Sequence, residues 1–348
     1  MKARAFPARE IPGRAMEDWR SLQHSNSHLA SPFFCPEYTT AIAAARDDVF
    51  VAFLEEGGKV VGCFPFQRNG HDSARPVGWP MCDYEAVIAG PATIWDANEL
   101  LRDCRLRAWE FDHLLVSQAP FRSFHRVHKI SPIVDMSANQ EGFFQQSAWF
   151  REMARNIRKL EREIGPVRFE PQVLDHEALD RLLVWWARKW TGHDKVGSWH
   201  RNAFHTILDT RTPSFAGTLS VLCAGDNFVA MSFGMRSRSV WHYWFPAYNP
   251  QFARYSPGTT LLAKMITTAT SLGITTLDLG PGEEHYKTRF MNSFVPIASG
   301  IVEAGLAPSN ARRFRFKIRG EVLQRNWLRP IAKTTAAVAR SITQILNM

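Results

Sequence analysis

The segment 239–292 constrains the fold more than any other part of the chain. Val240–Tyr248 is rich in aromatic residues and suits a half-buried strand. Apolar residues recur at helical spacing over 261–272, and Gly273 is the residue type expected just past a helix end. A second apolar strand, 274–279, follows after almost no loop. The segment therefore predicts two strands joined by a helix, a β-α-β unit.

The loop before this helix has the properties of an anion site. Ser256 stands where an N-cap is expected, and Pro257 stands at the first helical position. Backbone N–H groups at a helix N-terminus are unpaired and carry partial positive charge. Gly258 lets a ligand approach the backbone closely, and Arg254 adds a full charge that suits a phosphate. A diphosphate fits this loop, and an ordinary capped helix explains the same residues equally well.

Two motifs in this segment resemble GNAT acetyltransferases. They are Arg254-Tyr255-Ser256-Pro257-Gly258-Thr259 and the run LGPGEEHYKTRF from Leu279 to Phe290. Within that superfamily they look most like the CelD-type branch, which is related to FemAB. The resemblance implies that an acyl-CoA pyrophosphate lies on the first motif and that the pantetheine arm passes between two splayed strands. The usual signature is Arg/Gln-x-x-Gly-x-Gly/Ala, and this sequence keeps only one of its glycines. The likeness covers residues 150–300 well and the first half more loosely.

The resemblance implies an α/β (α+β) fold of two tandem GNAT-like domains. Each is a mixed, mostly antiparallel sheet flanked by helices. Two predicted hairpins fit the tandem, 49–54 with 59–67 and 218–223 with 228–236. The first copy has no loop like 254–259, so we expect it not to bind CoA. The expected boundaries are 1–145 for a degenerate, acceptor-side domain, 146–305 for the acyl-CoA-binding domain and 306–348 for a basic helical extension.

The composition favours a folded, reduced, cytoplasmic protein. The first residues contain no apolar run of the signal-peptide type, and no stretch of about 18 uncharged apolar residues predicts a membrane span. The 5 cysteines include no CxxC pair, so we expect reduced and mostly buried thiols. His24 and His28 have no third ligand nearby, and no metal is expected.

Positive charge is concentrated in the later part of the chain. Residues 1–150 carry 15 Lys+Arg and 18 Asp+Glu, whereas the remainder carries 27 and 15. Such a field attracts CoA phosphates, anionic glycans, nucleic acid or an anionic membrane, and does not choose among them. The arginines of a helix predicted within 147–168 either face water or bind an anionic substrate. A terminal helix within 306–348 either packs on the body or docks on a membrane surface or an acidic partner.

Acyl transfer from a thioester needs a deprotonated acceptor, a stabilised oxyanion and a proton for the leaving thiolate. By the resemblance, an amide near 245–248 polarises the thioester carbonyl. Gly280-Pro281-Gly282 would hold the next loop in a tight path. On this loop Tyr286 is expected to be the general acid, and Glu283 or Glu284 the general base. An exposed, charged loop is the alternative interpretation.

The remaining candidates divide into donor and acceptor contacts. The loop 78–84 carries an aromatic ring, a carboxylate and a phenol, which suits a sugar, or else it is a turn that packs its tryptophan onto the core. The residues expected to bind CoA are Arg254, Tyr255, Ser256, Gly258, Thr259, Phe245 and Lys287. Those expected to bind the acceptor are Trp79, Asp83, Tyr84, Lys189, His242, Trp244 and Arg289.

The sequence thus predicts an acyltransferase that uses an acyl-CoA, with acetyl-CoA as the first choice and no metal. The CelD-type resemblance implies a sugar or polysaccharide precursor as acceptor, in cellulose or exopolysaccharide synthesis, and polysaccharide-synthesis machinery as a partner. One alternative is a FemAB-like aminoacyl transferase that uses charged tRNA. Another is a non-catalytic GNAT-like scaffold subunit.

Overall fold

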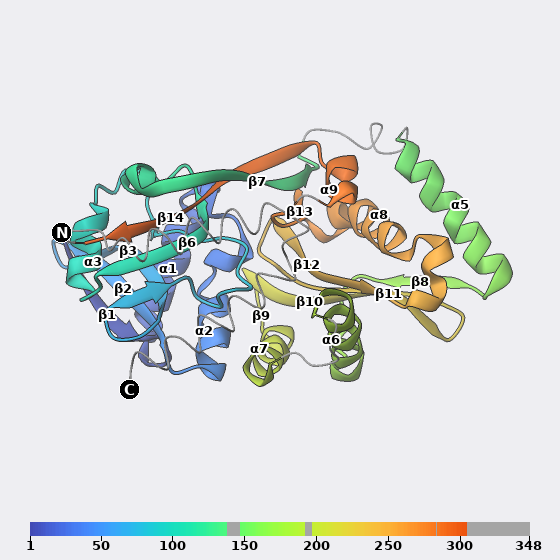
Figure 1. The fold of residues 1–348 in the computed structure, drawn as a ribbon, viewed down its shortest axis with the longest axis horizontal. Helices are drawn as coiled ribbons and strands as arrows, with labels where there is room; N and C mark the ends of the chain where they lie inside the picture. Colours follow the sequence, from blue (N-terminus) through green and yellow to red (C-terminus); the bar gives the residue numbers. More distant parts are fainter. Residues whose placement is uncertain (138–146, 192–196, 283, 305–348) are drawn as a thin grey trace, which may run out of the picture. The chain divides into compact units, whose positions relative to one another are not determined.

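A single 14-stranded sheet organises the described part of the chain. The computed structural model describes residues 1–137, 147–191, 197–282 and 284–304, and Met1–Val302 form one compact unit (Figure 1). The sheet is mostly antiparallel and is flanked by helices, which confirms the predicted mixed α/β fold. The expected C-terminal extension lies outside the described residues.

The first half supplies the strands at one end of the sheet. Its main elements are β1 (Lys2–Pro7), α1 (Gly13–His24), α2 (Pro36–Ala45), β2 (Val49–Glu56), β3 (Lys59–Arg68), β4 (Ser73–Arg75), β5 (Ile88–Ala89), α3 (Ala97–Asp103), β6 (Ala108–Leu115) and β7 (His125–Asp135).

The second half supplies the strands at the other end. Its main elements are α5 (Ala148–Glu163), β8 (Val167–Glu170), α6 (His176–Thr191), α7 (Ser198–Asp209), β9 (Arg211–Thr212), β10 (Phe215–Ala224), β11 (Asn227–Arg236), β12 (Val240–Tyr248), the 3₁₀ turn η5 (Pro250–Tyr255), α8 (Pro257–Ala269), β13 (Thr276–Asp278), α9 (His285–Phe290) and β14 (Ser293–Glu303).

The strand order reveals a repeat whose last strands are exchanged. It runs β1-β2-β3-β4-β6-β14-β7-β13-β12-β11-β10-β8, so each half contributes a hairpin followed by a β-α-β unit. Both predicted hairpins are confirmed, as β2–β3 and β10–β11. However, β7 of the first half pairs with β13, and β14 of the second half lies between β6 and β7. The expected boundary at 145/146 therefore separates two sets of elements that share one sheet.

Helices cover both faces of the sheet in the second half. On one face α6 packs on β12 and α7 packs on β10, and on the other α8 packs on β11 and β12 while α5 packs on α8. The buried face of α5 carries Asn156 beside three apolar residues (Trp149, Met153 and Leu160), and these three form a cluster with Leu261 and Leu262 of α8. The residues under α6 and α7 belong to a second cluster on the opposite face of the sheet. Because a cluster covers each face, β12 is buried on both sides.

The predicted β-α-β unit is confirmed as β12–α8–β13, with the two strands parallel. Gly273 ends the helical segment at φ +73°, as expected. The five cysteines are free thiols, four of them buried. No helix in the described part of the chain is long and apolar enough to cross a membrane.

Candidate active site

The pairing between β12 and β13 is short, and we call the place where it ends the opening. The two strands pair at Val240↔Thr276, Trp241↔Leu277 and His242↔Asp278. Beyond these pairs β12 continues to Tyr248, whereas β13 ends at Asp278. The strands therefore separate immediately after His242, as the resemblance implies for a pantetheine passage.

A bulge in β12 marks the closed end of this opening. Phe233 of β11 pairs with Phe245, and Met235 pairs with His242, so Tyr243 and Trp244 together face one residue, Gly234. A Cβ on that glycine would lie 2.0 Å from the His242 carbonyl oxygen, so only glycine permits this approach. A bulge leaves backbone groups outside the ladder. The bulge lies just before the expected 245–248.

The N-terminus of α8 lies beside Tyr248, where β12 ends, and we call this the open end of the opening. Ser256 occupies the predicted N-cap position, with φ +49°, but its side chain makes no capping hydrogen bond. Its carbonyl instead accepts from the Thr260 N–H at 3.1 Å and the Thr259 hydroxyl at 2.9 Å. A left-handed residue after a helical turn creates a concave set of backbone N–H groups that suits anions. At Gly258 an added Cβ would only touch Tyr248, at 3.7 Å. Neither packing nor backbone conformation requires a glycine at position 258. Because Gly258 has no side chain, the backbone N–H groups at this helix end stay uncovered.

Cations surround this helix end. Arg254 Nη2 lies 3.2 Å from Glu163 Oε2 at the end of α5, and its side chain is 65% exposed. Tyr255 is buried and donates its hydroxyl to the same carboxylate at 2.8 Å, so this expected CoA contact instead holds η5 against α5. Lys159 lies over the Tyr255 ring at 5.2 Å. Lys189 approaches from α6, 5.7 Å from the centre of the Tyr248 ring.

The loop after β13 is held by its own lysine. Lys287 is buried, and its Nζ donates to the carbonyls of Gly280 at 3.2 Å and Pro281 at 2.8 Å. It also forms an ion pair with Glu284 at 3.1 Å. Lys287 and Glu284 therefore stabilise the loop conformation in this structure. Glu283 lies outside the described residues.

Tyr286 and Arg289 project from α9 in different directions. Arg289 forms an ion pair with Glu152 of α5, which places this expected acceptor contact away from the opening. The Tyr286 ring lies edge-on to Tyr243 at 6.4 Å, beside the bulge. Burial raises the pKa of Tyr286, and Tyr243, Glu284 and the carboxylate of Asp83 raise it further. The hydroxyl thus stays protonated and can donate a hydrogen bond to an anionic group.

A buried polar network joins the two halves at the closed end. His242 Nε2 lies 2.8 Å from Asp83 Oδ2, and His242 Nδ1 lies 3.5 Å from Asp278 Oδ1. Asp278 also accepts from the Tyr84 hydroxyl at 2.7 Å, the Ser131 hydroxyl at 3.2 Å and the Gly280 N–H at 2.8 Å. The structure thus brings together three of the sequence-based acceptor candidates, on a loop of the first half and a strand of the second.

The network holds charge away from water. Burial alone would lower the pKa of His242, but Asp278 and Asp83 outweigh burial and raise that pKa to about 9. Burial would raise the pKa of Asp278, yet His242, Tyr84 and the Gly280 amide hold it below its usual range. We therefore assign an imidazolium between two carboxylates at neutral pH.

Other expected contacts are part of the core. Trp244 donates its ring N–H to the Met81 carbonyl at 2.8 Å, so it fastens the first-half loop rather than lining an open groove. Phe245 packs edge-on against Trp186 at 5.0 Å. Trp79 has the Arg75 guanidinium 4.2 Å from its ring centre and packs on the core cluster. This agrees with the alternative interpretation of 78–84 as a turn that packs its tryptophan onto the core.

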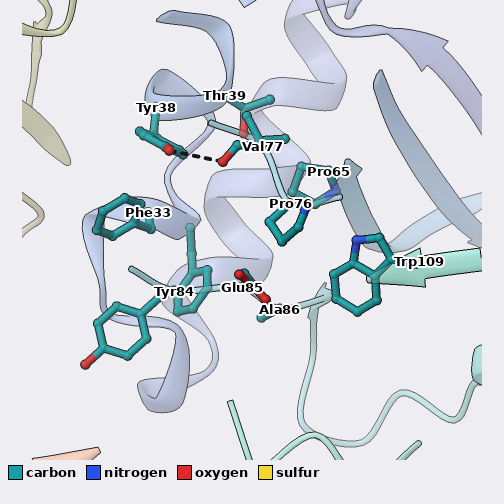
Figure 2. A pocket seen from close by; sticks show the side chains of 11 residues that line it. Phe33, Tyr38, Thr39, Pro65, Pro76, Val77, Tyr84, Glu85, Ala86 and Trp109 are labelled. Carbon is teal, nitrogen blue, oxygen red and sulfur yellow. Dashed lines mark hydrogen bonds between the residues drawn. The ribbon is translucent and has the colours of Figure 1, made fainter. Parts of the chain in front are cut away.

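The first half contains a small cavity of its own (Figure 2). Its volume is about 20 Å³, roughly the room for one water molecule. Glu85 lies against it, and burial followed by the nearby Asp112 raises the pKa of Glu85 well above its usual range. Tyr38 donates to the Val77 carbonyl at 3.1 Å across the same region. The cavity is too small for an acyl-CoA, and among the described residues no group of His, Cys, Asp or Glu is placed to hold a metal.

Sequence reasoning missed Asp278, Ser131 and Glu163. Asp278 had a detectable signal, because a carboxylate within the apolar run 274–279 needs a buried partner. Ser131 and Glu163 had none, because only the fold brings them to the site.

The fold is that of tandem GNAT proteins. Residues 148–288 match a family model described as an acetyltransferase (GNAT) domain, which supports transferase activity for this part of the chain. No curated protein matches the sequence.

Solved structures share the fold over most of the chain at low identity. The C-terminal domain of a predicted lysylphosphatidylglycerol synthetase from Agrobacterium fabrum is 12% identical, with a TM-score of 0.57 over 89% of this chain and 96% of that one. FemX is 10% identical, with a TM-score of 0.57 over 91% and 99%. A tandem GNAT protein from the clavulanic acid biosynthesis pathway is 10% identical, with a TM-score of 0.50 over 88% and 100%. At such identity these likenesses describe the fold alone.

Proposed function

We propose that this protein transfers an acyl group from an acyl-CoA, with acetyl-CoA as the first choice, to a nucleophile bound between the two halves. The observation that carries the proposal is the separation of β12 from β13 directly after His242↔Asp278, with the uncapped N-terminus of α8 at the other end. A diphosphate at that helix end would lie beside Arg254, and the acyl group would lie beside the β12 bulge and Tyr286.

Two of the three catalytic requirements then have a candidate group. A backbone amide of the β12 bulge would bind the developing oxyanion. The Tyr286 hydroxyl would give a proton to the leaving thiolate. The sugar acceptor and the role in cellulose or exopolysaccharide synthesis stay predictions, since the comparisons name no CelD-type protein.

Aminoacyl transfer from charged tRNA is the second candidate. The specific observation in its favour is the exposed face of α5, where Arg151, Arg155, Arg158 and Arg162 follow one another at helical spacing. Such a row of cations suits a phosphate backbone. The two candidates therefore differ in the donor that each one requires.

The test is calorimetric titration of the purified protein with acetyl-CoA and with CoA that lacks the 3′-phosphate. We expect micromolar binding that Arg254→Ala weakens at least tenfold, since a charged hydrogen bond is lost (about 1.4 kcal/mol). Glu163→Gln should strengthen binding a few-fold, because Glu163 competes with the phosphates for Arg254. Arg102→Ala on α3 is the control and should change nothing. Absence of binding to either ligand, with binding to charged tRNA, would replace the first candidate by the second.

A further inference from the structure

The network of His242, Asp83 and Asp278 has one end that reaches solvent. The side chain of His242 is 0% exposed and that of Asp278 is 4% exposed, whereas that of Asp83 is 21% exposed. Asp83 Oδ2 is bonded to His242, and within the described part of the chain Oδ1 carries no hydrogen bond. An acceptor entering the opening can therefore meet only Asp83 among the three groups.

We propose that Asp83 of the first half is the catalytic base that deprotonates a primary-amine acceptor, and that His242 and Asp278 are positioning residues behind it. This inference rests on the proposed acyltransferase function. It gives the first half a chemical role in the reaction of the second.

The position of Gly280 places the Asp83 carboxylate at the closed end of the opening. Gly280 has φ +71°, and a Cβ there would lie 2.8 Å from Asp83 Oδ2. The carboxylate is thus packed against the first residue after β13. Tyr286, on the helix that follows, packs on Tyr243, which comes directly after His242 in β12. The proposed acid and the proposed base therefore contact consecutive residues of β12.

The expected base Glu284 is less suited to this role. Its carboxylate forms an ion pair with Lys287 at 3.1 Å, and Lys287 is itself held by two backbone carbonyls. Accepting a proton would break that ion pair and disturb the loop. Asp83 can accept a proton on its unbonded oxygen while its other oxygen keeps the bond to His242.

The local charge favours an amine. The carboxylates of Asp83, Asp278 and Glu284 outnumber the cations His242 and Lys287 in the described residues of this region, which leaves one negative charge. An ammonium group complements that charge, whereas a neutral hydroxyl gains nothing from it.

Asp83 takes one proton from the ammonium, and the free amine forms a C–N bond with the thioester carbonyl carbon. The C–S bond then breaks, and the departing thiolate takes the Tyr286 proton. Tyr286 recovers a proton from the new amide nitrogen, and Asp83 releases its proton to water. The products are an amide, a free thiol and one proton.

The test combines kinetics with NMR on the full chain. Acetyl-CoA is supplied with matched amine and hydroxyl acceptors, such as glucosamine with glucose and putrescine with butanediol. We expect acetylation of amines only. Asp83→Asn should lower the rate of amine acetylation by 10²-fold or more and leave acetyl-CoA binding unchanged. Asp83→Asn should also lower the pKa of His242, measured from its ring nitrogen signals. Asp47→Asn, an exposed carboxylate of the same half, is the control for both readouts.

Several results would overturn the inference while leaving the donor proposal intact. One is acetylation of hydroxyls but not of amines. Another is full activity of Asp83→Asn together with loss in Glu284→Gln. A third is bound acetyl-CoA with no amine acetylated. Failure to bind acetyl-CoA at all would instead count against the proposed donor.

Discussion

The two β-α-β units, β4–α3–β6 and β12–α8–β13, share their topology and differ at the helix N-terminus. In both units the flanking strands are parallel. In the first, Asp96 caps α3 by accepting from the Asn98 and Glu99 amides, each at 2.9 Å. In the second, Ser256 makes no such bond. The first unit thus satisfies its helix N-terminus with its own carboxylate, whereas the second has no side-chain cap there.

The connections between strand and helix differ as well. Residues 249–256 join β12 to α8 by a short turn, whereas residues 76–96 join β4 to α3 by a longer path. That path carries Asp83 and Tyr84 to His242 and Asp278 of the other half. The longer connection of the first half therefore contacts the second half at the point where β12 and β13 stop pairing.

The largest expected effect comes from changing Gly234 of β11, which lies opposite the β12 bulge. Gly234→Ala would place a Cβ 2.0 Å from a backbone oxygen, so we expect a loss of about 3 kcal/mol or more in the free energy of unfolding. Gly62→Ala in β3 of the first half is the matched change. Its Cβ would lie 3.2 Å from Ala89 Cβ, and we expect a loss of about 1 kcal/mol. Equal losses in urea denaturation would show that the bulge is not specially constrained.

The link between the halves should weaken with rising pH. The pKa of His242 is raised to about 9, so its contribution is complete below the ordinary value of 6.5 and is lost as pH rises through about 9. The free energy of unfolding should therefore fall above pH 6.5, by at most about 1.4 kcal/mol per pH unit. Burial, with Arg46, lowers the pKa of His200 to about 4. The ionisation of His200 therefore changes the free energy of unfolding only below pH 6.5. If the free energy of unfolding of His242→Gln falls with pH as steeply as that of the wild type, His242 is not the source of the pH dependence.

A methyl group at the open helix end should block the donor without harming the fold. Gly258→Ala meets only Tyr248, at 3.7 Å, yet it occupies the space where we place the diphosphate. We expect acetyl-CoA affinity to fall about tenfold or more, the loss of one good phosphate contact (about 1.4 kcal/mol). Gly13→Ala at the start of α1 is the matched control, since a Cβ there meets nothing within 4 Å. Calorimetry compares the two, and unchanged affinity in Gly258→Ala would place the donor elsewhere.

The smallest effect concerns the caps themselves. Asp96→Ala removes two hydrogen bonds at the α3 N-terminus and should cost about 1 kcal/mol of stability. Ser256→Ala removes no capping bond and should change stability by no more than a few tenths of a kcal/mol. Thermal unfolding of both variants measures the difference. A comparable loss in Ser256→Ala would mean that its side chain caps α8 in solution.

Local patterns predicted much of the fold. Helical spacing over 261–272 and Gly273 located α8 and its end, and glycine turns located the two hairpins. These signals succeed because neighbouring residues decide them. The position of Ser256 before α8 was predicted as well, but not its left-handed backbone or the lack of a side-chain capping bond.

The sequence by itself determined the two hairpins and the β-α-β unit, and it singled out Asp83, Tyr84 and His242 as candidates. Only the tertiary structure decided that these residues meet, that Asp278 and Ser131 join them, and that the last strands of the two halves change places. These contacts join residues far apart in the chain, and their free energy comes from burial and pairing that exist only in the folded sheet.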